Sequence, residues 1–162
     1  MNNEEFCRLA EKYINMVYRI VIGSVKNSAD AEDIVQNTFE KLLRYNKPFN
    51  DDEHAKRWLI RVAVNECNYI FRRRSKIVTV PLEENIFIPG NFSSEESELL
   101  STIRALPNKY SQVLHLYYFE EYSTAEISGI LNISEANVRK RLQRARELLS
   151  KNLKETGNEQ GI

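Results

Sequence analysis

The first 76 residues carry apolar positions at a helical period. Apolar side chains recur at steps of three and four residues from Phe6 to Val21, which predicts a helix that ends near Val25. Ser28 is placed to cap the next helix, because a serine hydroxyl can accept from a free backbone amide. The same period predicts two further helices, residues 28–44 and residues 53–74.

The helical period is lost between residues 75 and 94, where Pro81 and the pair Pro89-Gly90 interrupt the chain. Helices are predicted again over residues 95–106, 108–119, 124–131 and 135–153. The sequence therefore predicts an all-α protein with two small helical domains, at residues 1–76 and 95–154. A flexible linker, residues 77–94, joins them, and residues 155–162 form a disordered tail.

Composition narrows the class of protein. With 162 residues, 42% of them apolar and 28% charged, the chain has enough apolar side chains for a core. No apolar run approaches the roughly 18 residues of a membrane helix, and the N-terminus lacks the pattern of a signal peptide. The two cysteines, Cys7 and Cys67, are too few for a disulfide framework or a thiolate metal cage, and both are expected to be buried. We expect a soluble, cytoplasmic protein.

Charge is balanced overall but unevenly distributed. The chain has 23 basic and 23 acidic side chains, so net charge does not indicate a nucleic-acid partner. Residues 77–99 hold five glutamates and no lysine or arginine, whereas residues 139–154 hold seven basic side chains opposed only by Glu147. A second basic cluster covers residues 72–76. Two basic regions therefore flank an acidic segment.

Residues 124–142 fit a helix-turn-helix. Ser123 and Glu126 have the spacing of a capping box, Asn132 tolerates the left-handed backbone of a tight turn, and Ser134 can cap the second helix. If Val138 and the apolar residues that follow it face inward, the outer face presents Arg139, Lys140, Gln143, Arg144 and Arg146. Such a helix fits the major groove of DNA, which is about 12 Å wide. The alternative is a solvated basic face on a short helical hairpin.

The predicted third helix mixes aromatic and cationic side chains. Trp58, Tyr69 and Phe71 alternate with Arg57, Arg61 and the run Arg72 to Arg74. Aromatic rings beside cations are typical of surfaces that stack unpaired bases. Trp58 lies on the apolar stripe of the helix, so we expect it in the core.

Four segments together resemble a known family. They are AEDIVQNTF, WLIRVAVN with the later Arg-Arg-Arg, LPNKYSQVL, and ISEANVRKRLQRAR. They occur in the order found in the bacterial extracytoplasmic-function (ECF) sigma factors, the minimal members of the sigma-70 family, which consist of the helical domains called region 2 and region 4. The resemblance covers about residues 5–153.

The resemblance implies a promoter-specificity subunit that binds core RNA polymerase and traps melted non-template bases. The partners that it implies are core polymerase, through the beta-prime coiled coil and the beta flap, promoter DNA and an anti-sigma factor. The positions that match those docking on polymerase are Asp33, Gln36 and Phe39. Those that match the −10 reader are Phe49, Asn65, Arg72, Arg73 and Arg74. Those that match the −35 reader are Arg139, Lys140, Gln143 and Arg144.

Two positions depart from the common family pattern: Asn132 replaces the frequent glycine of the turn, and Lys140 stands where a small residue is usual. We still expect binding to a −35 element, but these two residues leave open which DNA sequence it prefers.

Three other functions are weighed against this one. A free-standing helix-turn-helix regulator would dimerise on a palindromic site without polymerase. An adaptor would hold a partner protein between two helical domains. An enzyme is the weakest reading, because His54 and His115 are the only histidines, neither has a neighbour at metal-ligand or triad spacing, and His115 is expected to be a packed residue. We expect no catalytic activity, no metal and no cofactor.

Overall fold

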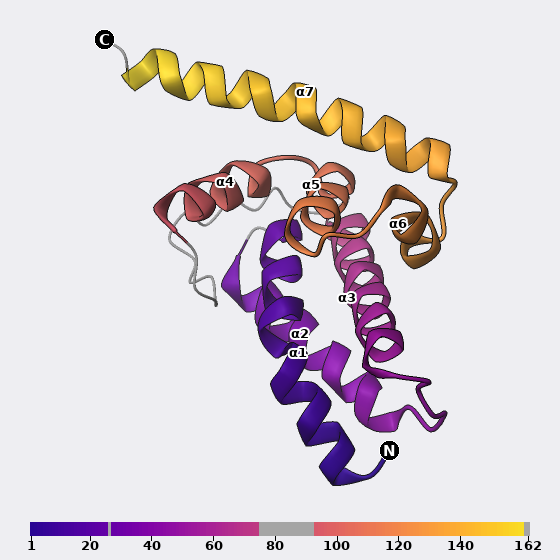
Figure 1. Ribbon diagram of the computed structural model, residues 1–162. Coiled ribbons are helices and arrows are strands. Elements are labelled where there is room, and N and C mark those ends of the chain that lie inside the picture. The colour runs from indigo at the N-terminus through magenta and orange to yellow at the C-terminus, as the bar shows by residue number, and fades with distance from the viewer. Residues whose placement is uncertain (26, 75–92, 161–162) are drawn as a thin grey trace. The chain divides into compact units, whose positions relative to one another are not determined.

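The computed structural model describes residues 1–25, 27–74 and 93–160 (Figure 1). The chain divides into two compact units, Met1–Gly90 and Asn91–Ile162. In the described residues both units are built from helices, which confirms the all-α prediction. The predicted linker lies almost wholly outside the described residues.

Unit 1 contains three helices: α1 (Asn3–Ser24), α2 (Ser28–Arg44) and α3 (Asp52–Arg74). Each of the three packs against the other two. Apolar side chains at helical spacing from all three helices meet in one core, since a stripe three or four residues apart falls on one helix face. The fully buried members include Leu9, Val17, Val21, Ile34, Leu42, Leu59 and Ile60.

The N-cap of α2 differs from the prediction by one residue. Asn27, not Ser28, caps the helix: its Oδ1 accepts the Asp30 amide at 2.9 Å, and its Nδ2 donates to the Asp30 carboxylate at 3.0 Å. An asparagine amide both accepts and donates, so it bonds the backbone and the side chain of Asp30 at once. A serine hydroxyl offers fewer such bonds, and Ser28 becomes the first helical residue.

An ion-pair cluster joins α1 to the start of α3. Asp52 accepts from Arg8 at 2.9 Å and from Lys12 at 2.7 Å, while the Tyr13 hydroxyl donates to the Asp52 carbonyl at 3.1 Å. The hydrogen bonds from Arg8 and then Lys12 lower the pKa of the Asp52 carboxyl from 3.8 to about 2. These contacts hold the first residue of α3 beside α1.

Unit 2 contains α4 (Ser94–Arg104), α5 (Asn108–Leu114), the π-helical turn η1 (His115–Phe119), α6 (Thr124–Leu131) and α7 (Glu135–Gln160). Helix α7 packs against α4, α5 and α6. The sequence predicts one helix over 108–119, whereas its last turn widens and the Glu120 amide donates to the His115 carbonyl at 3.2 Å. His115 is buried, as predicted, and stacks on Phe119 with centroids 5.3 Å apart.

Three further expectations are corrected. Cys67 is buried, and desolvation raises the pKa of its thiol to about 12, but Cys7 is exposed on α1. Trp58 is half-buried rather than in the core. Helix α7 continues to Gln160, beyond the predicted end near residue 153, because extending a formed helix adds one hydrogen bond per residue without a new nucleus.

None of the described helices combines the length and apolar character that crossing a bilayer demands.

Candidate nucleic-acid and polymerase interfaces

The turn between α6 and α7 has the geometry of a helix-turn-helix. Asn132 ends α6 in the left-handed conformation, with φ 56° and ψ 47°, as its predicted role requires. The Ser128 hydroxyl donates to the Ile133 carbonyl at 2.6 Å, and the Ile133 amide donates back to the Ser128 carbonyl at 3.3 Å. The left-handed residue and these two hydrogen bonds therefore fix the backbone of the turn that joins α6 to α7.

Both helices of this motif are capped as predicted. The Ser123 hydroxyl accepts the Glu126 amide at 3.1 Å, and the Glu126 carboxylate accepts the Ser123 amide at 3.0 Å, which completes the capping box. Ser134 accepts the amide of Asn137 at 3.1 Å at the start of α7. The Thr124 hydroxyl donates to Glu135 at 2.9 Å, a contact between the two helix starts that sequence reasoning missed.

Helix α7 separates an apolar face from a cationic one. Its inward stripe of Val138, Leu142 and Ala145 is buried against the rest of unit 2. The structure brings the predicted −35 residues together on the exposed side: Arg139, Lys140, Gln143 and Arg144. This outer face, the α7 cationic face, projects side chains long enough to reach base edges and phosphates.

Two arginines of the α7 cationic face are paired with glutamates of their own helix. Arg139 lies 3.1 Å from Glu135, and Arg144 lies 3.1 Å from Glu147. Each arginine side chain is more than half exposed, at 60% and 57%. Solvent-exposed pairs of this kind are weak, about 0.2–1 kcal/mol, so a phosphate can replace the glutamate at little cost.

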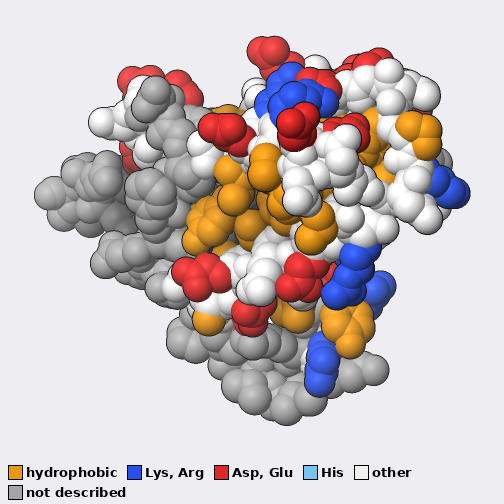
Figure 2. Space-filling model, turned by 90° about the horizontal axis from the view of Figure 1, so that it is seen from below, with side chains coloured by type: hydrophobic (Ala, Val, Ile, Leu, Met, Phe, Trp, Pro, Cys, Tyr) orange, Lys and Arg blue, Asp and Glu red, His pale blue; other side chains and the backbone are white. Residues whose placement is uncertain are grey.

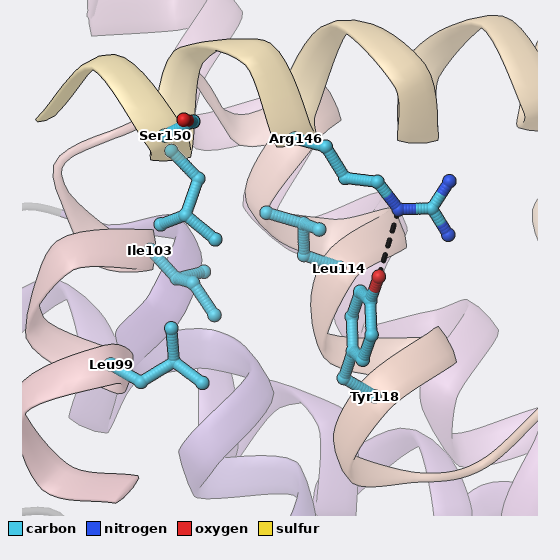
Figure 3. A pocket seen from close by; sticks show the side chains of 7 residues that line it. Leu99, Ile103, Leu114, Tyr118, Arg146 and Ser150 are labelled. Carbon is cyan, nitrogen blue, oxygen red and sulfur yellow. Dashed lines mark hydrogen bonds between the residues drawn. The ribbon is translucent and has the colours of Figure 1, made fainter. Parts of the chain in front are cut away.

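Arg146 is tied to η1 instead, although the sequence places it with the outer cations. Its Nε donates to the Tyr118 hydroxyl at 2.8 Å (Figure 3). Its guanidinium also lies over the rings of Tyr117 and Tyr118, 5.4 Å and 5.7 Å from their centroids. These contacts turn Arg146 towards the body of unit 2.

An open apolar pocket of about 430 Å³ lies beside Arg146. Figure 3 shows its wall built from three helices and η1 of unit 2, with side chains of α4 and α5 facing those of α7. The lining residues are Leu99, Ile103, Leu114, Tyr118, Arg146, Leu149 and Ser150. The pocket is thus apolar, with the Arg146–Tyr118 contact at one side.

The loop before α3 and the first turns of α3 together carry a group of rings that we call the aromatic cluster: Tyr45, Phe49, His54 and Trp58. Phe49 stacks on Tyr45, with centroids 4.9 Å apart and planes at 16°. Its other neighbours are the edges of His54, at 5.2 Å, and Trp58, at 5.9 Å. Trp58 also lies 4.8 Å from Tyr45, which explains why it is half-buried at the surface rather than in the core.

The other predicted −10 residues follow along α3. Asn65 is exposed, seven residues beyond Trp58 and therefore about 10 Å further along the same face of the helix. Arg72 and Arg73 are exposed near the end of α3, whereas the side chain of Arg74 lies outside the described residues. The structure therefore places Asn65 and the arginines on α3, and Phe49 in the loop that precedes this helix. Tyr69 and Phe71 are also exposed.

The predicted polymerase-docking residues divide between surface and core. Asp33 and Gln36 are exposed on α2, where the Gln36 amide donates to Glu40 at 3.3 Å. Phe39 is only 8% exposed and packs in the core of unit 1. Its spacing relative to Ile34 and Leu42 is the signal for burial.

Charged groups of both signs are mixed with apolar ones on the surface. In the view of Figure 2, acidic, basic and apolar side chains all reach the surface. In the described part of the chain, no group of three or more histidine, cysteine or carboxylate side chains is placed to hold a metal ion.

Comparisons with known proteins address both units. Residues 9–77 match the family described as sigma-70 region 2, and residues 96–149 match the one described as sigma-70, region 4. The chain is 32% identical over 146 residues to the ECF RNA polymerase sigma factor SigM of Bacillus subtilis, which covers 86% of this chain and 89% of that protein. The chain belongs to the ECF sigma factors of the sigma-70 family.

Other similar proteins agree with this assignment. RNA polymerase sigma factor SigV of Bacillus subtilis is 28% identical over 134 residues, covering 82% of this chain and 81% of that protein. Among solved structures, the sigma factor RpoE in complex with the anti-sigma factor NepR, from Bartonella quintana, has a TM-score of 0.73 at 20% identity, over 93% of this chain and 98% of that one. CnrH in complex with the cytosolic domain of CnrY has a TM-score of 0.63 at 22% identity, over 94% and 90%. The two structures show a shared fold.

The sigma factor assignment is confirmed over the free-standing regulator. Sigma factors are regulatory proteins, which agrees with the expectation that the chain is not an enzyme. Sequence reasoning missed the aromatic cluster as a unit. The signal available was the density of rings between residues 45 and 58, at steps of four and five residues across a loop.

Proposed function

We propose that this sigma factor docks on core RNA polymerase through the exposed side of α2. Asp33 and Gln36 are the contact residues, and they stand on the same helix side because their spacing of three residues is close to one turn. Phe39 supports this surface from within, since its ring packs in the core of unit 1. The docked surface belongs to the beta-prime coiled coil, and unit 2 engages the beta flap.

The −10 element is read by the aromatic cluster and the exposed face of α3. Phe49 offers a stacking surface to a base extruded from the non-template strand, and Asn65 offers an amide to a base edge. Arg72, Arg73 and Arg74 follow the DNA backbone. Support comes from the contacts of Phe49 with Tyr45 and Trp58, which hold the ring in place before DNA arrives.

The −35 element is read by the α7 cationic face. Arg139, Lys140, Gln143 and Arg144 lie together on a helix that its buried stripe holds firmly. Arginine and glutamine reach base edges in the major groove, and the remaining cations meet phosphates. Because phosphate contacts release counterions, the affinity for duplex DNA falls as the salt concentration rises.

The chain performs no covalent chemistry in this role and works in the cytoplasm, where core polymerase is found. An anti-sigma factor controls it. This proposal is supported by the two similar solved structures, which are complexes with the anti-sigma factor NepR and with the cytosolic domain of CnrY. One observation carries the whole assignment: a single chain combines an exposed cationic helix face with an aromatic cluster at the start of α3.

Transcription by purified core polymerase, with and without the chain, tests the function on a library of genomic fragments. Mapped RNA 5′ ends should share −35 and −10 elements that depend on the chain. Phe49→Leu keeps the apolar volume but removes the stacking ring, so it should lower initiation on these promoters by about 5–150-fold. Core polymerase should still bind this variant. Absence of new starts and of binding to core polymerase would overturn the proposal in favour of a free-standing regulator.

A further inference from the structure

The start of α3 is capped in an unusual way. Asp51 accepts the backbone amide of His54 at 2.7 Å, which is the ordinary N-cap bond. In return, His54 Nδ1 accepts the backbone amide of Asn50 at 3.1 Å. In a capping box, glutamate or glutamine at this position accepts the backbone amide of the cap residue itself. Here an imidazole nitrogen is the acceptor, and its donor is Asn50, one residue before the cap residue Asp51.

The imidazole also touches the residue proposed to stack on DNA. The ring of Phe49 meets the His54 ring edge-on, with centroids 5.2 Å apart and planes at 89°. Asn50 follows Phe49 directly, and the peptide group between them is planar. A hydrogen bond that holds the Asn50 amide therefore also holds the carbonyl end of Phe49.

Phe49 is thus restrained from several directions. Tyr45 stacks on one face of its ring, and Trp58 lies against it at 62°. Residues 45–51 form no helix, so the loop has no ladder of backbone hydrogen bonds to keep its shape. In such a segment, side-chain bonds to the backbone determine where a ring points.

We infer that His54 is a positioning residue for base capture, and that it acts by accepting the Asn50 amide through Nδ1. This inference rests on the proposed role of Phe49 and adds a residue to it. Without the acceptor, the loop samples orientations in which Phe49 leaves Tyr45, and a flipped base loses its prepared surface. Preorganisation of this kind lowers the cost of binding.

Two substitutions separate the acceptor from the ring. His54→Asn places an amide oxygen as many bonds from the backbone as Nδ1, so the Asn50 amide keeps a partner. His54→Phe keeps a ring edge beside Phe49 but removes the acceptor. His54→Ala removes both and serves as a second loss variant should His54→Phe fold poorly. Asn46→Ala, at an exposed position of the same loop, is the matched control.

The first readout uses the free full-length chain. Trp58 is the single tryptophan and lies 4.8 Å from Tyr45, so its fluorescence reports on the aromatic cluster. Quenching by acrylamide should rise in His54→Phe and His54→Ala and stay at the wild-type level in His54→Asn and Asn46→Ala. Unchanged quenching in His54→Ala would contradict the inference whatever the chain does on DNA.

The second readout uses holoenzyme on a promoter obtained by transcript mapping, with 2-aminopurine in the non-template −10 strand. Melting should fall about fivefold in His54→Phe, the fold-change that corresponds to one net hydrogen bond, and stay within about twofold of wild type in His54→Asn. Full melting by His54→Phe with loss in His54→Asn would assign the effect to the ring and overturn the acceptor role. Wild-type chain that melts no promoter would instead refute the proposed function, while Trp58 quenching would still decide the positioning.

Discussion

The two units position their proposed recognition residues by different physical means. In unit 2 the α7 cationic face stands on a helix whose backbone bonds and buried stripe fix the side of unit 2 from which its side chains leave. In unit 1 Phe49 stands in a loop, and its direction depends on contacts with Tyr45, His54 and Trp58. The backbone of a helix sets the positions of its recognition residues, whereas a ring in a loop depends on contacts with neighbouring side chains, here largely those of α3.

The two units also differ in how freely their recognition side chains can move. Arg139 and Arg144 are long, flexible and paired with glutamates of the same helix, so their positions can adjust when DNA replaces those partners. An aromatic ring that receives a base has no such freedom, because stacking requires a fixed plane. We therefore expect promoter binding to tolerate small displacements of the unit 2 side chains better than it tolerates displacement of the Phe49 ring.

The largest effect is expected from removing two cations together. The double variant Arg139→Ala with Arg144→Ala should weaken binding of holoenzyme to promoter duplex by about 2–6 kcal/mol, since each arginine contact is worth about 1–3 kcal/mol. The salt dependence of binding should also become shallower, by about one unit of slope for each phosphate that an arginine no longer neutralises. Filter binding over a range of salt concentrations measures both quantities.

That variant also sharpens the comparison of the two units. On a template whose −10 region is already melted, the double variant should still capture the non-template strand, because unit 1 is unchanged. Lys151→Ala removes an exposed cation further along α7 and should leave duplex binding near wild type. Equal losses on melted and duplex templates would contradict the separation of roles.

Loss of the capping box tests how far α6 depends on side-chain bonds. Ser123→Ala leaves the Glu126 amide without its partner and should destabilise unit 2 by about 1 kcal/mol. For a unit of this size the corresponding fall in melting temperature is about 4–8 °C. Thermal unfolding followed by circular dichroism measures it, with Ser101→Ala, at an exposed position inside α4, as the control. A shift equal to that of the control would show that the cap contributes nothing.

A smaller effect, of opposite sign, is expected from removing an acidic partner. Glu147→Gln frees Arg144 from its ion pair at 3.1 Å, so Arg144 no longer exchanges one anion for another when DNA binds. Affinity for duplex DNA should rise by an amount matching an exposed pair, about 0.2–1 kcal/mol. Fluorescence anisotropy at low and physiological salt measures it. Weaker binding by this variant would show that Glu147 orients Arg144 for DNA instead of competing with it.

The smallest effect is expected from the ion pairs that Asp52 forms with Arg8 and Lys12. The pKa of Asp52 is lowered from 3.8 to about 2 by hydrogen bonds from Arg8 and Lys12. Because the folded state holds the ionised carboxylate, this contribution to stability is full above about pH 4 and is lost as the pH falls towards 2. Asp52→Asn should therefore be less stable than wild type near neutral pH and equal to it at the acid end.

Urea unfolding at a series of pH values measures this difference. Glu11→Gln removes an exposed carboxylate from α1 and is the control for a simple change in net charge. A constant difference between Asp52→Asn and wild type down to pH 2 would mean that the carboxylate charge is not the source of the stability.

Helix-forming segments were predictable because their signals are local. The period of apolar residues identified every helix of the described chain, and the short-range cap signals at Ser123, Asn132 and Ser134 identified the ends of α6 and the start of α7. These signals act over three to five residues. The α2 cap was placed one residue too late, because Asn27 and Ser28 are both good caps and only the bond to Asp30 decides between them.

The sites were predictable to different degrees for the same reason. The residues of the α7 cationic face share one side of a helix, so spacing alone grouped them. The aromatic cluster joins side chains of a loop to side chains of α3, and the spacing of apolar residues does not predict the path of a loop. Helical spacing assigned Arg146 to the outer face, and its bond to Tyr118 was not predictable because the two residues are 28 positions apart in the chain.

By itself the sequence determined two helical units, the helix-turn-helix and a cationic helix face, because these depend on backbone hydrogen bonds and apolar spacing within one segment. Only the tertiary structure decided that Trp58 joins Tyr45 and Phe49 at the surface, and that His54 accepts the Asn50 amide. Such contacts depend on how a loop returns to its helix and which side chains fill the space between elements, and packing of the whole unit sets both.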